Sequence, residues 1–377
     1  MKKVLMFILT LATASSASAQ PKPTQQPPGV RVAMQPDAWD TDPDRAAFIT
    51  HRAVPAVQGL DNGALMHLKE LDFENGTIEF DIELPERGFV GIRFRQSDDH
   101  SVGEDFYIRS FWPVNPRNRT LTQYTTMVDS LSLWDLTDDY QAPAPLYQNQ
   151  WNHVKLVANG RQLRVSVNDT AVLHVPVLES ARTVGKLSLS GNAIFANLVV
   201  RPDATEDLPA VAGYDPTQYD PYYLRNWSVT SPVDFPAGRD VVDADLPDST
   251  TQWKPIHAEH RALVNLSKAF GKTKEGGRRL AWLKTTIRSE KEQVKRLRLG
   301  FSDEVWVLIN GQLLHVDKNY FGTPAMKEPR GRCTLANTSF DLPLRAGENE
   351  LTIGVANYFY GWGLIARLDD AEGLAAK

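Results

Sequence analysis

The chain has 377 residues and a formal net charge of -5, with 41 Lys and Arg against 46 Asp and Glu. This length exceeds one ordinary hydrophobic core, so two domains are expected. The weakly acidic balance, without a basic block, argues against nucleic acid as a partner. The only cysteine, Cys333, excludes an intramolecular disulfide framework and is expected to be a small buried residue.

The N-terminus has the features of a secretory signal peptide over residues 1–19. Two lysines precede a short apolar run, and Ala17-Ser-Ala19 supplies a cleavage site. The apolar run is too short to span a bilayer, so no membrane insertion is expected after cleavage. This predicts a periplasmic or secreted bacterial protein. Residues 20–39 begin with a proline-rich stretch and are predicted to be a spacer.

Residues 40–202 read as short alternating strands separated by turns. In the run 77–84, apolar residues alternate with acids, which indicates a strand with one face in a core and one in water. The runs 88–95 and 105–117 continue the pattern. The strongest hairpin joins 151–158 to 162–167 through Asn159-Gly160. Many short strands without an amphipathic helix predict a sandwich or jelly roll.

These runs, with Gln150-Trp-Asn-His-Val-Lys-Leu156 and Gly185-Lys-Leu-Ser-Leu189, resemble the concanavalin A-like lectin/glucanase superfamily. The resemblance is greatest to its laminin-G-like members and to the related 3-keto-disaccharide hydrolase domains. It implies the fold of residues 40–202 and says less about their function.

Residues 203–222 are rich in proline and acid and are predicted to be a linker. In the unit 223–377, Val305-Trp-Val-Leu-Ile-Asn-Gly311 and Leu344-Arg-Ala-Gly-Glu-Asn-Glu-Leu351 are similar to the galactose-binding-like jelly roll. That module accompanies family-two glycosidases and many sugar-binding proteins. The predicted fold class is therefore all-β, with two sandwich or jelly-roll domains in tandem.

Glu79, Asp81 and Glu83 alternate along one predicted strand. They are similar to the acid motif of laminarinase-type retaining glucanases, in which two carboxyl groups stand about 5–5.5 Å apart. Glu79 and Glu83 would be roughly 13 Å apart at the backbone, so their side chains would have to lean together. A plain turn, Glu74-Asn-Gly76, precedes them where those enzymes have a long loop. A solvated acidic strand face is the favoured interpretation.

A second cluster combines arginines, aromatic rings and amides, the groups that stack on sugar rings and bond to hydroxyls or carboxylates. Arg93 and Arg95 are expected to project from one strand face. The alternative is an arginine–carboxylate lattice with Glu79, Asp81, Asp105 and Asp135. The predicted ligand-binding residues are Arg93, Arg95, Arg109, Trp112, Asn115, Gln123, Tyr124 and Trp134.

The resemblance to 3-keto-disaccharide hydrolases implies the same region. Phe106-Tyr-Ile-Arg109 and Gln123-Tyr124 fall where that family has arginine and glutamine signatures, although Leu121 stands where it usually has an acid. In the second unit, Tyr358, Tyr360 and Trp362 are either a sugar-stacking shelf or core aromatics. The scattered histidines predict no metal site and no cofactor, and a structural calcium ion is left open.

The leading prediction is an exported, non-catalytic glycan-binding protein of the bacterial envelope, with an oligo- or polysaccharide as its partner. One alternative is a glycoside-acting hydrolase that uses Glu79, Asp81 and Glu83 or is related to the 3-keto-disaccharide group. A structural adhesion module is the third. The sequence leaves the oligomeric state open.

Overall fold

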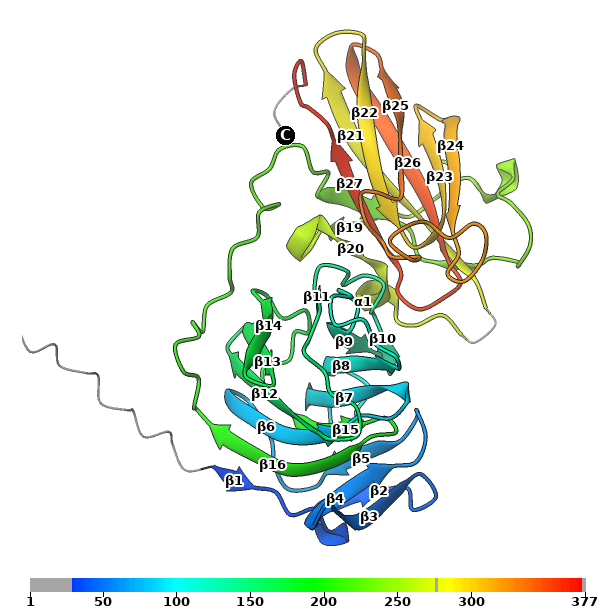
Figure 1. Cartoon of the computed structure of the whole chain (residues 1–377). Coiled ribbons are helices and arrows are strands. Elements are labelled where there is room, and N and C mark those ends of the chain that lie inside the picture. Colours follow the sequence, from blue (N-terminus) through cyan, green and yellow to red (C-terminus); the bar gives the residue numbers. More distant parts are fainter. Residues whose placement is uncertain (1–28, 275–276, 375–377) are drawn as a thin grey trace, which may run out of the picture.

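The computed structural model describes residues 29–274 and 277–374, which form two β-rich bodies, one above the other in Figure 1. The predicted signal peptide and residues 20–28 of the predicted spacer lie outside these residues. Strand pairing is antiparallel in each of the four sheets. The all-β prediction is confirmed. No helix in the described parts of the chain is long and apolar enough to cross a bilayer.

The first sandwich packs two sheets face to face. Sheet I has the order β14-β13-β12-β6-β16-β4-β3, with β1 beside β16. Its strands are β1 (Val30–Arg31), β3 (Ala46–His51), β4 (Val54–Gly59), β6 (Gly76–Glu83), β12 (Trp151–Asn159), β13 (Gln162–Val167), β14 (Thr170–Val175) and β16 (Ile194–Pro202).

Sheet II has the order β10-β9-β8-β7-β15-β5-β2, with β11 beside β9. Its strands are β2 (Trp39–Thr41), β5 (Leu65–Leu68), β7 (Arg87–Gln96), β8 (Gly103–Phe111), β9 (Thr122–Val128), β10 (Leu131–Ser132), β11 (Gln141–Ala142) and β15 (Lys186–Ser190).

The second sandwich packs sheet III, in the order β19-β17-β21-β26-β23-β24 with β18 beside β21, on sheet IV, in the order β20-β27-β22-β25. Sheet III contains β17 (Asn226–Val229), β18 (Val233–Asp234), β19 (Lys254–His257), β21 (Arg279–Ser289), β23 (Asp303–Ile309), β24 (Gln312–Asn319) and β26 (Gly347–Asn357). Sheet IV contains β20 (Val264–Asn265), β22 (Gln293–Phe301), β25 (Thr338–Leu344) and β27 (Gly363–Leu368).

Alternation along the strands builds both cores. On β6, Ile78, Phe80 and Ile82 are fully or almost fully buried between sheets I and II, as the sequence predicts. A separate cluster of buried side chains fills the second sandwich. The Asn310-Gly311 turn joins β23 to β24 with positive φ at both residues, which is the backbone that the tight hairpin requires. Short helices are η1 (Pro36–Ala38), η2 (Asp243–Asp245), η3 (His260–Ala262) and α1 (Leu266–Phe270).

The segments around the strands differ from expectation in one respect. Residues 30–39 were predicted to be spacer, but Val30 and Arg31 pair with β16, and Trp39 is buried in the first core. Val32 and Met34 are buried in the same core, so this stretch supplies burial that a free spacer would lack. Residues 203–225 connect the sandwiches, and Leu208 is buried on the way.

The two sandwiches are docked through a buried contact. Leu133 and Leu136 of the first sandwich pack with Leu263 and Ile365 of the second. The confirmed buried Cys333 belongs to the same cluster, and its backbone N–H donates to the carbonyl of Asp135 at 2.9 Å.

Candidate functional site: a cleft between the two sandwiches

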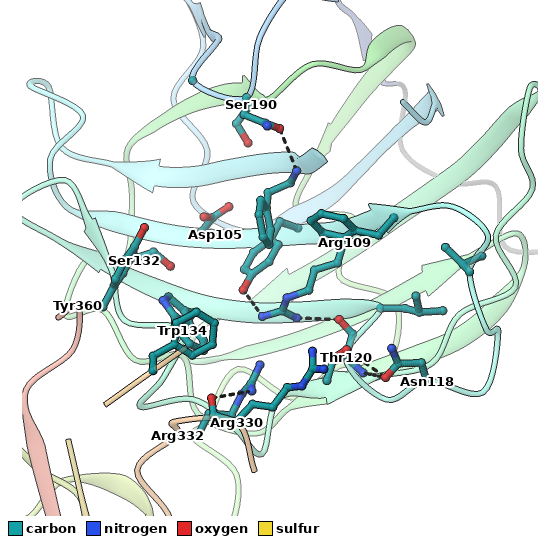
Figure 2. Close-up of a pocket in the computed structure, with 18 of the residues that line it drawn as sticks. Asp105, Arg109, Asn118, Thr120, Ser132, Trp134, Ser190, Arg330, Arg332 and Tyr360 are labelled. Carbon is teal, nitrogen blue, oxygen red and sulfur yellow. Dashed lines mark hydrogen bonds between the residues drawn. The ribbon is translucent and has the colours of Figure 1, made fainter. Parts of the chain in front are cut away.

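A cavity of about 930 Å³ lies where the outer face of sheet II meets the second sandwich. This is the size of cleft that proteins use for small ligands. Figure 2 shows Asp105, Arg109 and Trp134 of the first sandwich around it, together with Arg330, Arg332 and Tyr360 of the second. We call this cavity the cleft.

The floor of the cleft follows from strand alternation on β8. Phe106 and Ile108 point into the first core, so Asp105, Tyr107 and Arg109 point outward and line the cleft. The same alternation on β7 presents Phe89 and Arg93. The cleft is therefore built on rigid strands rather than on a loop alone.

Arg109 is held in one orientation by neutral acceptors. Its Nη1 donates to the carbonyl of Thr120 at 2.7 Å, and its Nη2 donates to the Tyr107 hydroxyl at 2.6 Å and to the Gln123 amide oxygen. Gln123 is itself fixed, because its Nε2 donates to the carbonyl of Trp134 at 2.6 Å. These three acceptors are neutral, so the guanidinium is pre-oriented by its hydrogen bonds without a carboxylate bonded to it among the described residues.

Asp105 is the carboxyl group of the cleft floor. Its Oδ2 lies 3.8 Å from the Nε of Arg93, and its buried Oδ1 has no hydrogen-bond partner among the described side chains and backbone. Burial raises the pKa of Asp105 to about 6, and the positive charge of Arg93 opposes the rise. A carboxyl group with this pKa can take up or release a proton near neutral pH.

The second sandwich contributes the loop that contains Phe359 and Tyr360. Asp135 accepts from the backbone N–H of Gly361 at 3.0 Å, and Asp303 accepts from that of Phe359 at 2.7 Å. Burial raises the pKa of Asp135 to about 7 and that of Asp303 above its usual value. These two carboxyl groups, one from each sandwich, fix the loop against the cleft.

Aromatic rings form two groups around the cleft. Phe89 stands edge-on to Phe111, with ring centroids 5.3 Å apart. Trp134 stands edge-on to Phe321 and Tyr360 at 5.1 and 5.8 Å. Phe89 is 48% exposed and Tyr360 39% exposed. Exposed rings beside fixed polar groups are suited to the alternating apolar and hydroxyl surfaces of a sugar.

Of the predicted ligand-binding residues, the structure brings Arg93, Arg109, Asn115 and Trp134 to the cleft. Gln123 lies beneath the cleft and orients Arg109. Trp112 packs against the first core instead of forming a platform, because its ring covers the edge of that core.

Two further predictions, those of Arg95 and Tyr124, are wrong in placement. Arg95 is completely buried and donates to the carbonyls of Glu74 at 2.8 Å and Gly160 at 2.7 Å, across the sandwich. A β-bulge is the reason: Phe94 and Arg95 together oppose one residue of β15, and Arg95 has a φ of 51°. Arg93 and Arg95 therefore do not share a face. Tyr124 also points inward and donates to Glu104 at 2.6 Å.

The acidic row lies elsewhere, on the outer face of sheet I. Each carboxylate has basic partners: Glu79 pairs with Arg201, Asp81 with His153 at 2.8 Å, and Glu83 with Arg52 at 2.6 Å. The favoured interpretation of a solvated acidic face agrees with this pairing. Neither Asp81 nor Glu83 is kept protonated as an acid catalyst would be, because hydrogen bonds from His153 and Asn197 outweigh the burial of Asp81 and lower its pKa, and a hydrogen bond from Arg52 lowers that of Glu83.

In the second sandwich only Tyr360 of the predicted shelf lines the cleft. Tyr358 is exposed beside it, and Trp362 is buried in the second core, so Trp362 has the alternative role of a core aromatic. Among the described residues, no group of three or more His, Cys, Asp or Glu side chains is placed to hold a metal ion.

Several cleft residues were missed by the sequence analysis. Asp105 was considered only as a lattice carboxylate, although its alternation with Tyr107 and Arg109 placed all three on one face. Arg330 and Arg332 lie far away in the sequence in an irregular loop, and no local pattern links them to β8. Other cleft residues that the sequence analysis missed are Phe89, Phe111, Asn118, Phe321 and Phe359.

Three comparisons with known proteins give the following results. A family model described as a 3-keto-alpha-glucoside-1,2-lyase-like domain matches residues 26–199, which is less than half of the chain. No curated protein matches.

Among solved structures, a carbohydrate-binding module from Bacillus subtilis is 16% identical, over 43% of this chain and 93% of that one, with a TM-score of 0.33. A galectin-like protein of unknown function from the same organism is 12% identical, over 46% and 94%, with a TM-score of 0.34. A glycosyl hydrolase candidate from Parabacteroides distasonis is 12% identical, over 44% and 94%, with a TM-score of 0.33.

Proposed function

We propose that this protein is an exported bacterial protein that binds an oligo- or polysaccharide in the cleft between its two sandwiches. The observation that carries the proposal is the composition of the cleft, where aromatic rings and pre-oriented polar groups from both sandwiches surround one cavity. The similarity of residues 26–199 to a domain named for action on a glucoside supports the same class of ligand.

The rings and the polar groups have separate tasks in this proposal. Phe89, Phe111 and Tyr360 supply flat apolar surfaces for the C–H faces of sugar rings. Arg109 and Asn118 supply hydrogen bonds to hydroxyl groups. Because Arg109 is already held by Thr120 and Gln123, binding costs little side-chain entropy there.

The test is a glycan array on the mature protein, followed by calorimetry with the saccharide that the array identifies. Phe89→Ala and Tyr360→Ala should each weaken binding by roughly tenfold, because each removes a contact ring worth about 1–2 kcal/mol. The matched controls are Tyr219→Ala and Tyr358→Ala, which remove exposed rings outside the cleft. Both controls should bind like the parent. Absence of binding to any saccharide, or equal loss in variants and controls, would refute the proposal.

A second candidate function is elimination on a 3-keto glucoside, and Asp105 is the observation that favours it. In a 1,2-elimination a base removes the proton on C2, the C–H electron pair forms the C1–C2 double bond, and the C1–O bond breaks. The departing oxygen takes up a proton. Asp105 is a buried carboxyl group in the cleft with an unpartnered oxygen and a pKa of about 6, which suits it to the role of base.

This candidate predicts turnover of a 3-keto-α-glucoside that rises with pH through about 6, as Asp105 loses its proton. Asp105→Asn should abolish turnover and leave saccharide binding within about threefold of the parent. Release of the aglycone by the parent, measured by mass spectrometry, would establish catalysis. Equal turnover by Asp105→Asn would exclude Asp105 as the base.

A further inference from the structure

The cleft has more positive than negative side chains. Among the described residues that line it, Arg93, Arg109, Arg330 and Arg332 are cationic, and Asp105 is the single carboxyl group. Asp105 already forms an ion pair with Arg93. Three guanidinium groups therefore remain for which the lining of the cleft provides no counter-ion.

Asp138, which lies behind the lining, compensates this charge only in part. It is shared between Arg332, whose Nε lies 3.2 Å from Oδ1, and the exposed Arg119, whose Nη1 lies 3.2 Å from Oδ2. The Nε of Arg332 is buried and makes no hydrogen bond to a described atom, although it lies 3.2 Å from Asp138. A buried donor left in this way costs free energy that a bound acceptor would recover.

Arg109 and Arg332 also come from different sandwiches and still lie close enough for their charges to repel. Burial lowers the pKa of Arg332, and the positive charge of Arg109 lowers it further. Two like charges in a partly buried site are unfavourable unless an anion lies between them. Arg330 adds an exposed third guanidinium, and its backbone carbonyl accepts from Arg332 at 3.5 Å.

The three arginines are grouped at one end of the cleft, as Figure 2 shows, together with Asn118 and Thr120. Asp105 is four residues from Arg109 on β8, which separates their Cα atoms by about 13 Å. Asp105 forms its ion pair with Arg93 on the neighbouring strand, and Figure 2 draws it apart from Arg330 and Arg332, so an anionic group bound beside those two arginines stays clear of its charge.

We infer that the cleft selects a saccharide bearing a carboxylate or sulfate group, and that this group is bound by Arg109, Arg330 and Arg332. The inference rests on the proposed function and adds the chemical class of the ligand. Guanidinium groups match the planar oxygens of a carboxylate and the oxygens of a sulfate through paired N–H donors. The second sandwich, which supplies Arg330 and Arg332, then has the role of determining specificity.

Three oligosaccharides of equal length test this inference by calorimetry: a neutral oligoglucoside, the corresponding oligoglucuronide and a sulfated oligoglucoside. At least one anionic ligand should bind roughly tenfold or more tightly than the neutral one, and added salt should reduce the difference. Comparing the two anionic ligands distinguishes a carboxylate site from a sulfate site.

Arg330→Gln is the informative variant, because Arg330 is exposed and its side chain makes no ion pair with a described residue. It should weaken the anionic ligand several-fold and leave the neutral one unchanged. Arg345→Gln, on the exposed turn between β25 and β26, is the matched control and should change neither affinity.

The outcomes separate this inference from the proposed function. Equal affinity for all three ligands, or equal effects of the two variants, overturns the inference while saccharide binding stands. Absence of binding to any of the three, together with a blank glycan array, overturns both. Tight binding of the anionic ligand that Arg330→Gln weakens selectively supports both.

Discussion

The two outer faces of the first sandwich carry similar side chains but partner them differently. On sheet I, Glu79, Asp81 and Glu83 lie beside Arg201, His153 and Arg52, so each carboxylate has a basic partner. On sheet II, Arg109 is bonded only to neutral groups, and the unpartnered Oδ1 of Asp105 lies in the cleft. The three carboxylates of the first face all have partners within the protein, whereas the second face has polar atoms that are free to bond to a ligand.

The covering of the two faces differs as well. The outer face of sheet II is covered at one end by the second sandwich, which encloses the cleft and lowers the local dielectric. Burial then raises the pKa of Asp105, whereas the pKa of Asp81 on the other face is lowered despite partial burial, because His153 and Asn197 bond to it. The comparison shows that a similar set of residues becomes a candidate site only where a second body excludes water and leaves charges unpaired.

The largest expected effect on the unfolding free energy comes from weakening the contact between the second sandwich and the first. Arg261 of the second sandwich lies 3.2 Å from Glu179 and 3.0 Å from Asp139 of the first. Burial opposes ionisation of Glu179, yet Arg261, His260 and Lys268 hold its pKa at about 2. Arg261→Met leaves this buried carboxylate without its main partner and should cost about 3–5 kcal/mol of unfolding free energy.

Denaturant unfolding measures this loss, and Arg288→Met, which breaks an exposed pair with Glu348, is the control with an expected change below about 1 kcal/mol. Saccharide binding should fall together with stability only for Arg261→Met. A loss no larger than that of the control would mean that the second sandwich is not held by this ion pair.

A smaller effect on the unfolding free energy is expected at the outer face of sheet II, from the ionisation of Asp105. Its pKa is raised from 3.8 to about 6, so its contribution to stability is fully present below about pH 4 and is lost as pH rises through about 6. Asp105→Asn cannot ionise. The unfolding free energy of the variant relative to that of the parent should therefore rise between pH 4 and 7, by up to roughly 3 kcal/mol.

Unfolding free energies of the parent and Asp105→Asn at several pH values measure this difference, and other titrating groups cancel in the comparison. A constant difference between pH 4 and 7 would show that Asp105 is ionised throughout, as on the opposite face.

The smallest effect on the unfolding free energy is expected at the outer face of sheet I. Asp81 accepts from His153 at 2.8 Å and from Asn197 at 2.7 Å, and its lowered pKa means that its contribution is present above about pH 4 and lost as pH falls. Since both charged side chains are partly exposed, Asp81→Asn should cost only about 0.5–1 kcal/mol at pH 7.

Saccharide affinity and any turnover of Asp81→Asn should equal those of the parent. A change in either would move the functional site to the acidic face, contrary to the placement of the cleft.

Local sequence pattern accounts for the β architecture and for much of the outer face of sheet II. Alternation predicted β6, β7 and β8 with their buried sides, and Asn159-Gly160 predicted the hairpin of β12 and β13, because both depend on neighbours along the chain. Alternation also sufficed to place Arg93 and Arg109 on the outer face that lines the cleft.

Which of these groups a ligand can reach depends on how distant segments of the chain pack together. The bulge at Arg95 reversed its direction, and the packing of sheet I on sheet II enclosed Tyr124. Arg332 comes near enough to Arg109 for their charges to interact because Asp135 and Arg261 hold the second sandwich on the first through bonds between segments distant in sequence. Strand periodicity is a local property, but burial and charge pairing depend on contacts between segments distant in sequence, and these contacts created the cleft.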